Sequence, residues 1–129
     1  MKTEEKIRNQ LNDNAIILYM KGVPEQPECG FSAKAVAALK SVGSDFAFVN
    51  ILQAPFIREK LPEVSNWPTF PQLFIQGELV GGSDIIEAMH EDGSLLSAIQ
   101  AIETEAVESK QTDGMSHAEV SQLIKQNYP

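Results

Sequence analysis

Residues 15–39 read AIILYMKGVPEQPECGFSAKAVAAL, and this stretch decides the fold because it joins two different patterns. Its first six residues are an apolar run ended by a Lys-Gly pair, which is typical of a buried strand. A proline-containing loop follows, and from Phe31 onward apolar residues recur at helical spacing until Gly43. Cys29 lies between the loop and that helix. The stretch therefore predicts a strand, a loop and a helix, with a thiol at the helix N-terminus.

The same patterns continue on both sides of this stretch. Residues 3–13 carry Ile7 and Leu11 on one face, with Thr3 as a candidate N-cap, and predict a helix. Further strands are expected at residues 46–51, 67–75 and 78–82, and further helices at residues 53–64, 83–93 and 94–107. The first half is then a βαβ unit, and the second half supplies an antiparallel pair. This order predicts an α/β fold with a four-stranded mixed sheet and helices on both of its faces.

The composition limits the class of partner. The 129 residues carry a net charge of -8, which opposes nucleic-acid binding through phosphate contacts and docking on an anionic membrane. No apolar run approaches the roughly 20 residues of a membrane span, and residues 1–10 lack an apolar signal segment. The single cysteine excludes an intramolecular disulfide. We therefore expect a small acidic cytoplasmic protein that binds neither nucleic acid nor membrane.

The chain length suits one folded domain, and the composition changes near the end of the chain. Residues 1–108 carry the strand and helix patterns, whereas residues 109–129 are mostly polar. Within this tail, Ser116 and Glu119 stand at capping-box spacing before several apolar residues. We predict a folded domain at residues 1–108 and a polar C-terminal tail at residues 109–129, with a short helix that carries no chemistry.

Cys29 has two interpretations. Taken alone, a single cysteine is more often a small buried apolar residue than a reactive one. Its place at a helix N-terminus, across the loop from Lys21, instead favours the thiolate, because free N–H groups and positive charge stabilise the anion. Ser32 stands where a dithiol oxidoreductase would have its resolving cysteine, and a hydroxyl cannot form a disulfide. Any disulfide that this protein forms must therefore be with an external thiol.

Three segments together resemble the monothiol glutaredoxins of the CGFS type, in their bacterial single-domain class. These segments are KGVPEQPECGFS (residues 21–32), WPTFPQLFI (residues 67–75) and GELVGGSDI (residues 77–85). Their order and spacing match the family over about residues 3–108, and the tail lies outside the match. The resemblance implies a thioredoxin-like fold with a groove for glutathione and a reactive Cys29.

The resemblance also implies which residues bind glutathione. Lys21 and Arg58 resemble the basic residues that hold its glycine carboxylate; without the family, solvated surface charge would be the preferred interpretation. Thr69, Phe70 and Pro71 resemble the segment whose backbone pairs with the glutathione cysteine as an added short strand. Pro71 matches the cis-proline of the fold, and the alternative for this segment is an ordinary entry into a strand.

A second part of the implied groove lies at the start of the helix at residues 83–93. Gly82 and Ser83 would offer backbone N–H groups to the γ-glutamyl carboxylate, and Asp84 would receive the ammonium group of glutathione. The alternative for Asp84 is a simple helix cap, since Glu87 follows at capping-box spacing. Many relatives carry cysteine where this chain has Ser83, so a second oxidisable thiol is lost here.

The number of thiols bears on the cofactor that the resemblance implies. A [2Fe–2S] cluster usually needs four thiolate ligands, and this chain supplies one, Cys29. The family implies a homodimer that holds a labile cluster between two Cys29 thiolates and two glutathiones. It implies delivery of the cluster to apo iron–sulfur proteins, a role in redox homeostasis, and a BolA-like partner.

The alternative function is a glutathione-dependent thiol–disulfide oxidoreductase that removes glutathione from proteins through Cys29 alone. The loop at Pro24–Glu28 resembles the family's longer version of this loop, and the resemblance implies that this longer loop misplaces glutathione for catalysis. At most weak activity of this kind is therefore expected.

Overall fold

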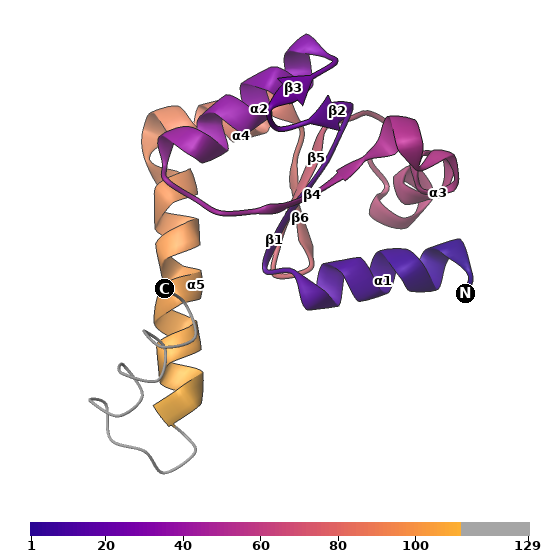
Figure 1. Cartoon of the computed structure of the whole chain (residues 1–129). Coiled ribbons are helices and arrows are strands. Elements are labelled where there is room, and N and C mark those ends of the chain that lie inside the picture. Colours follow the sequence, from indigo (N-terminus) through magenta and orange to yellow (C-terminus); the bar gives the residue numbers. More distant parts are fainter. Residues whose placement is uncertain (112–129) are drawn as a thin grey trace. The chain divides into compact units, whose positions relative to one another are not determined.

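The computed structural model describes residues 1–111, and the side chains of residues 1–102 (Figure 1). Its elements follow in the order α1 (Thr3–Asp13), β1 (Ile16–Met20), β2 (Gly22–Val23), β3 (Gln26–Pro27), α2 (Gly30–Ser41), β4 (Ala47–Asn50), η1 (Ile51–Gln53), α3 (Pro55–Ser65), β5 (Gln72–Ile75), β6 (Glu78–Gly81), α4 (Ser83–Asp92) and α5 (Ser94–Gln111). No helix in this described part is long and apolar enough to span a bilayer.

Four of the described strands form the mixed sheet that the sequence predicts, and β2 and β3 pair separately. Its strand order is β4-β1-β5-β6, with β1 parallel to β4 and antiparallel to β5, and β5 antiparallel to β6. The parallel pair is joined through α2, as expected for a βαβ unit. The α/β prediction is therefore confirmed, and β1 lies inside the sheet with a neighbour on each side.

The residues of β1 alternate between two buried faces. Ile17 and Tyr19 belong to an apolar cluster with Ile7 of α1, Leu61 of α3 and Phe74 of β5. The Tyr19 and Phe74 rings pack edge to face at 5.6 Å, and burial raises the pKa of the Tyr19 hydroxyl above its usual value. Since side chains alternate along a strand, Leu18 and Met20 point to the opposite face, on which α2 and α4 pack against each other.

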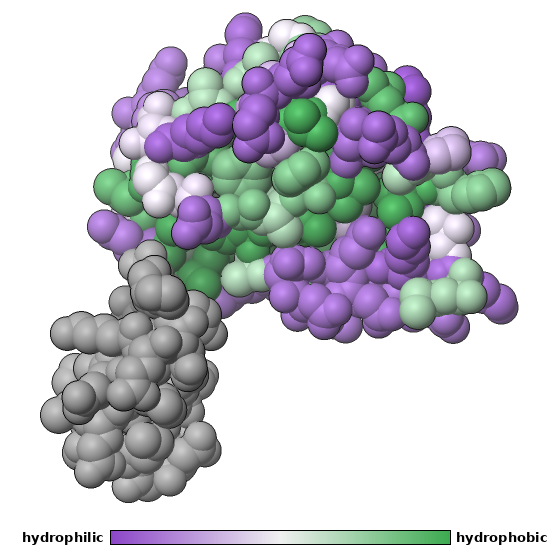
Figure 2. Space-filling model, in the orientation of Figure 1, coloured by the Kyte–Doolittle hydropathy of each residue, from purple (hydrophilic) through white to green (hydrophobic). Residues whose placement is uncertain are grey.

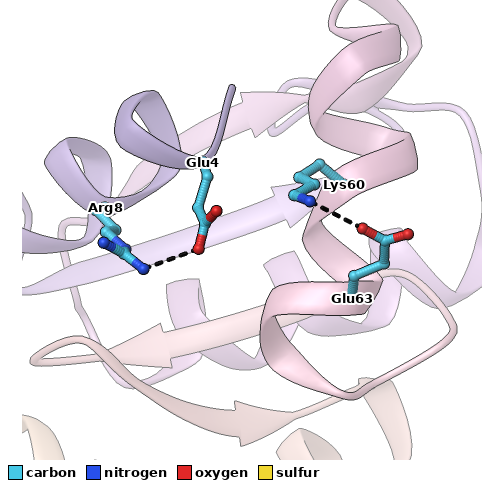
Figure 3. A network of polar contacts seen from close by, with 4 residues as sticks. All are labelled: Glu4, Arg8, Lys60 and Glu63. Atoms are coloured by element: carbon cyan, nitrogen blue, oxygen red, sulfur yellow. Dashed lines mark hydrogen bonds and ion pairs between the residues drawn. The ribbon is translucent and has the colours of Figure 1, made fainter. Parts of the chain in front are cut away.

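Helix α1 is amphipathic and its surface is polar. Ile7 is its buried residue, and polar side chains cover the outside of the helix in the space-filling view (Figure 2). Glu4 pairs with Arg8 at 2.8 Å within α1, and Lys60 pairs with Glu63 at 3.1 Å within α3 (Figure 3). These ion pairs are solvent-exposed and each lies within one helix, so they add little to stability. The packing of α1 on α3 rests on the apolar cluster.

Three local features differ from the sequence predictions. Thr3 is the first helical residue of α1, and Lys2 is the N-cap, so the predicted cap is wrong by one position. The capping box of Asp84 and Glu87 is also absent from the described structure, because Gly82 is the N-cap of α4 and no side chain caps the helix. The loop before Cys29 contains a small hairpin of β2 and β3, which the sequence analysis did not predict. Strands of two residues are too short to leave a recognisable pattern in the sequence.

The chain divides into two compact units, and the first ends at Leu95. Helix α5 runs without a break across residue 108, where the sequence analysis ends the folded domain. The helix predicted near Ser116 lies outside the described residues. The division of the chain at residue 108 therefore stays a prediction.

Replacing Leu61 by alanine tests the cluster on the α1–α3 face. Leu61 is 0% exposed, so Leu61→Ala should leave a cavity and lower the free energy of unfolding by about 2–5 kcal/mol. Val64 lies on the same helix and is 38% exposed, so Val64→Ala should cost about 1 kcal/mol or less. Urea denaturation measures both, and equal losses would contradict the proposed core.

Candidate functional site

A pocket of about 710 Å³ gathers residues from five separate segments of the unit at residues 1–95. It is lined by Lys21, Cys29, Phe31, Arg58, Pro62, Trp67, Pro68, Thr69, Phe70, Pro71, Gly82, Ser83, Asp84 and Ile85. The nine site residues that the sequence analysis names all line it. The structure therefore brings the predicted residues together, and their individual roles stay predictions.

Cys29 is the N-cap of α2, with extended backbone angles of φ -152° and ψ 136°. Its thiol is partly exposed. The backbone N–H of Ser32 is the main cause that lowers the pKa of the Cys29 thiol. Burial of the thiol is the second-largest effect and opposes it, and the Phe31 N–H, the Lys21 charge and the Ser32 hydroxyl each add a smaller lowering. These groups favour the thiolate because each presents positive charge to the sulfur.

Ser32 has a structural role besides its effect on the thiol. Its side chain is fully buried, and its hydroxyl oxygen accepts a hydrogen bond from the Lys21 backbone N–H at 3.1 Å. The Lys21 carbonyl accepts a hydrogen bond from the Glu28 N–H at 2.9 Å. These two hydrogen bonds hold the backbone of Lys21 to Glu28, just before Cys29, and to Ser32, in the first turn of α2. This arrangement keeps Lys21 and Cys29 on the same pocket wall.

The turn before β5 forms a second wall. Gln72 is fully buried, and its side-chain amide donates hydrogen bonds to the Trp67 carbonyl at 2.9 Å and to the Thr69 carbonyl at 3.1 Å. The peptide bond between Phe70 and Pro71 is cis, as the resemblance implies. One buried carboxamide therefore fixes the shape of the turn from inside, and the turn's other surface faces the pocket.

The N-terminus of α4 forms the third wall and lies close to the turn. A Cβ on Gly82 would lie 3.4 Å from both the Pro71 carbonyl oxygen and Trp67 Nε1, at the close end of ordinary van der Waals contact. The α4 ladder begins with the Ile86 N–H, which donates to the Gly82 carbonyl at 3.0 Å. The N–H groups of the preceding helical residues are not used within the helix, so this end carries partial positive charge. Asp84 lies in this first turn and is exposed.

The sequence analysis did not assign five of the lining residues to the pocket. They are apolar or ring-bearing: Phe31, Pro62, Trp67, Pro68 and Ile85. Each stands near a predicted residue in the chain or one helical turn from it, which is the signal that could have found them. Phe31 is 57% exposed and Ile85 is 37% exposed, so an apolar rim flanks the thiol side and the helix side of the pocket.

The described part of the chain contains no group of three or more His, Cys, Asp or Glu side chains that could hold a metal ion. Cys29 is therefore not part of such a group within the described residues.

Removing the charge of Lys21 tests its effect on the thiol. Because Lys21 favours the thiolate, Lys21→Gln should raise the pKa of Cys29 and slow its alkylation by iodoacetamide at pH values near that pKa. Alkylation rates measured from pH 5 to pH 10 give the pKa for each variant. Lys34→Gln is the control, since Lys34 lies on exposed α2 surface and does not line the pocket. Identical pH profiles for wild type and Lys21→Gln would contradict the effect.

Comparisons with known proteins agree with this fold. The glutaredoxin family matches residues 16–80. Glutaredoxin 4 of Buchnera aphidicola subsp. Acyrthosiphon pisum is 57% identical over 99 residues, which cover 77% of this chain and 92% of that protein. Glutaredoxin 4 of Escherichia coli strain K12 is 56% identical over 98 residues, which cover 76% of this chain and 85% of that protein.

Solved structures show the same fold. Reduced poplar apo GrxS14 is 39% identical with a TM-score of 0.67, covering 76% of this chain and 90% of that one. A monomeric truncated mutant of Trypanosoma brucei 1-C-Grx1 is 34% identical with a TM-score of 0.69, covering 78% of this chain and 91% of that one. The predictions of a thioredoxin-like fold and of resemblance to monothiol glutaredoxins are confirmed. This chain belongs to the glutaredoxin family, as a monothiol member whose one thiol is Cys29.

Proposed function

We propose that this protein binds glutathione in the pocket and, as a homodimer, carries a labile [2Fe–2S] cluster that it delivers to apo iron–sulfur proteins. One observation carries the proposal. A partly exposed thiol with a lowered pKa shares a pocket with two cationic side chains and a helix N-terminus. This combination suits a ligand that has both a thiol and two carboxylates. The pocket of about 710 Å³ is within the range of small-molecule sites.

Glutathione matches the pocket group by group. Lys21 and Arg58 would hold the glycine carboxylate, since both are cationic and line the same pocket. The N–H groups at Gly82 and Ser83 would hold the γ-glutamyl carboxylate at the positive end of α4, and Asp84 would pair with the ammonium group.

The remaining part of the ligand would lie along the turn before β5. The backbone of Thr69, Phe70 and Pro71 would pair with the cysteinyl residue of glutathione as an added strand, which directs its thiol toward Cys29.

The cluster proposal follows from the number of thiolates. A [2Fe–2S] cluster is usually held by four of them, and one chain supplies only Cys29. A second copy would supply the second thiolate, and two bound glutathiones would supply the other two. Half of these ligands are not covalently attached to protein, which makes the cluster transferable cargo. Phe31, exposed and two residues after Cys29, offers apolar surface for the second copy.

The same site would serve the other partners of the proposal. A BolA-like protein would replace one copy of the chain at the thiol side of the pocket. The cytoplasm suits this function, because its glutathione pool keeps thiols reduced. In this proposal the domain at residues 1–108 does the binding, and the tail at residues 109–129 takes no part in the chemistry.

The second candidate function is reduction of protein–glutathione mixed disulfides, and the lowered pKa of Cys29 favours it. The Cys29 thiolate would attack the glutathione sulfur, the protein thiolate would leave, and Cys29 would become disulfide-bonded to glutathione. A second glutathione thiolate would then attack that disulfide, releasing oxidised glutathione and the Cys29 thiolate. Ser32 cannot resolve the intermediate, so the reaction depends entirely on external glutathione.

Anaerobic reconstitution distinguishes the two functions. With iron, sulfide and glutathione, the wild-type protein should acquire a visible chromophore that elutes as a dimer in gel filtration. Omitting glutathione or introducing Cys29→Ser should abolish the chromophore, because each change removes two of the four ligands. Ser41→Ala, at the exposed end of α2, should behave as wild type. A colourless monomer that turns over a glutathione mixed disulfide would instead establish the oxidoreductase function.

Replacing Arg58 tests the glutathione site independently of iron. Arg58→Gln should weaken glutathione binding roughly 10-fold, since one charge-assisted partner of the carboxylate is lost. Isothermal titration at low salt measures the dissociation constant, and added salt should narrow the difference between wild type and variant. Arg8→Gln is the matched control, because Arg8 pairs with Glu4 on α1 and does not line the pocket. Equal losses in both variants would point to net charge alone and contradict the assignment of Arg58.

A further inference from the structure

Asn50 lies where two segments of the chain diverge. One segment carries Lys21 and the other carries Arg58, the two cationic residues of the pocket. It is the last residue of β4 and lies beside Met20, the last residue of β1, in the parallel ladder. The ladder ends at this pair. The β1 chain continues through Lys21 into the β2–β3 hairpin, and the β4 chain continues through η1 into α3, which carries Arg58.

One side-chain oxygen joins the two departing chains. Asn50 Oδ1 accepts a hydrogen bond from the Gly22 backbone N–H at 3.0 Å and another from the Leu52 backbone N–H at 3.1 Å. Both donors are main-chain groups, so the bridge fixes backbone positions on each side. A single neutral hydrogen bond contributes modestly to stability, but losing a shared acceptor leaves two donors without their partner at once.

The Asn50 bond to Gly22 lies at a sharp turn of the backbone. Gly22 has a φ of +92°, and a Cβ there would lie 2.7 Å from the Gln26 carbonyl oxygen and from the Glu28 backbone nitrogen. The chain therefore turns sharply immediately after Lys21, in a way that favours glycine. The Asn50 bond acts on this turn, next to Lys21, whose backbone is bonded to Ser32 and Glu28.

On the other side, the path from Asn50 to Arg58 is short and regular. Asn50 caps η1, which leads through Ala54 into the first turn of α3. There the Arg58 N–H donates to the Ala54 carbonyl at 3.0 Å. Asn50 thus contacts the start of both segments, while it is not itself among the residues that line the pocket.

We propose that Asn50 is a positioning residue that sets the separation of Lys21 and Arg58, so that both can bind one carboxylate. The inference rests on the proposed glutathione function, and it names the glycine carboxylate as the group whose binding depends on Asn50. Asn50 makes no contact with the ligand and acts only through the two cations. The affinity for a carboxylate that is bound by two cations depends on the spacing of the cations, because each of its two oxygens must meet a donor.

A pair of ligands that differ at one carboxylate tests this role. Isothermal titration compares glutathione with glutathione ethyl ester, in which the glycine carboxylate is blocked. Asn50→Ala should weaken glutathione roughly 5- to 10-fold and change the affinity for the ester less than about 2-fold. Asn50→Asp keeps an oxygen acceptor for both N–H groups and should restore most of the affinity for glutathione.

Two further variants complete the experiment. Asn50→Ser carries a hydroxyl too short to reach both donors, and should show the ligand selectivity of Asn50→Ala even if the alanine variant is poorly folded. Asn9→Ala removes an exposed asparagine of α1 that does not line the pocket, and should leave both affinities unchanged.

The outcomes separate this inference from the function on which it rests. Equal losses for both ligands, or no loss for either, would overturn the positioning role while glutathione binding by wild type stands. A wild-type protein that binds glutathione and its ester equally would overturn the role of Lys21 and Arg58, and with it that of Asn50. A wild-type protein that binds neither ligand would overturn the proposed function itself.

Discussion

The pairing of β1 on both of its edges is the constraint on which the rest of the structure depends. Its backbone is bonded to β4 on one side and β5 on the other, and its side chains are buried on both faces. A strand held in this way cannot shift in register without exposing apolar residues. The positions where β1 ends and β5 begins are therefore fixed. Segments next to these positions, with Lys21, Cys29 and the turn before Gln72, form part of the pocket.

Buried and half-buried polar side chains shape these segments more than exposed charges do. The Ser32 hydroxyl holds the Lys21 backbone, the Gln72 amide holds the turn at residues 67–69, and the Asn50 oxygen joins two chains that diverge. Each forms hydrogen bonds with backbone groups that are not paired within the sheet or the helices, because backbone groups shielded from water need a hydrogen-bond partner. In contrast, the ion pairs of Glu4 with Arg8 and Lys60 with Glu63 are solvent-exposed, and their residues do not line the pocket.

The electrostatics of the site contrast with those of the whole chain. The chain has a net charge of -8, yet Lys21, Arg58 and the N-termini of α2 and α4 present positive charge to one pocket. Backbone N–H groups contribute to this field without altering the composition, so it does not appear in a count of charged residues. Lys21 and the N–H groups at the start of α2 lower the pKa of Cys29, and the whole set of positive groups would attract the carboxylates of glutathione. Thiol activation and ligand binding would thus share Lys21.

The sequence by itself determined the βαβ unit, the β5–β6 hairpin, the single thiol at the start of α2 and nine of the fourteen residues that line the pocket, because apolar periodicity and family motifs are local in the chain. It misplaced the caps at Thr3 and Asp84, since several adjacent residues can cap a helix equally well and the approach of the chain decides among them. Only the tertiary structure decided that the Ser32 hydroxyl bonds the Lys21 N–H and that the Asn50 side chain bonds the Gly22 N–H, because these partners are 11 and 28 residues apart in the chain and meet only when the sheet is packed. A hydrogen bond between a side chain and a distant backbone atom leaves no pattern in the sequence.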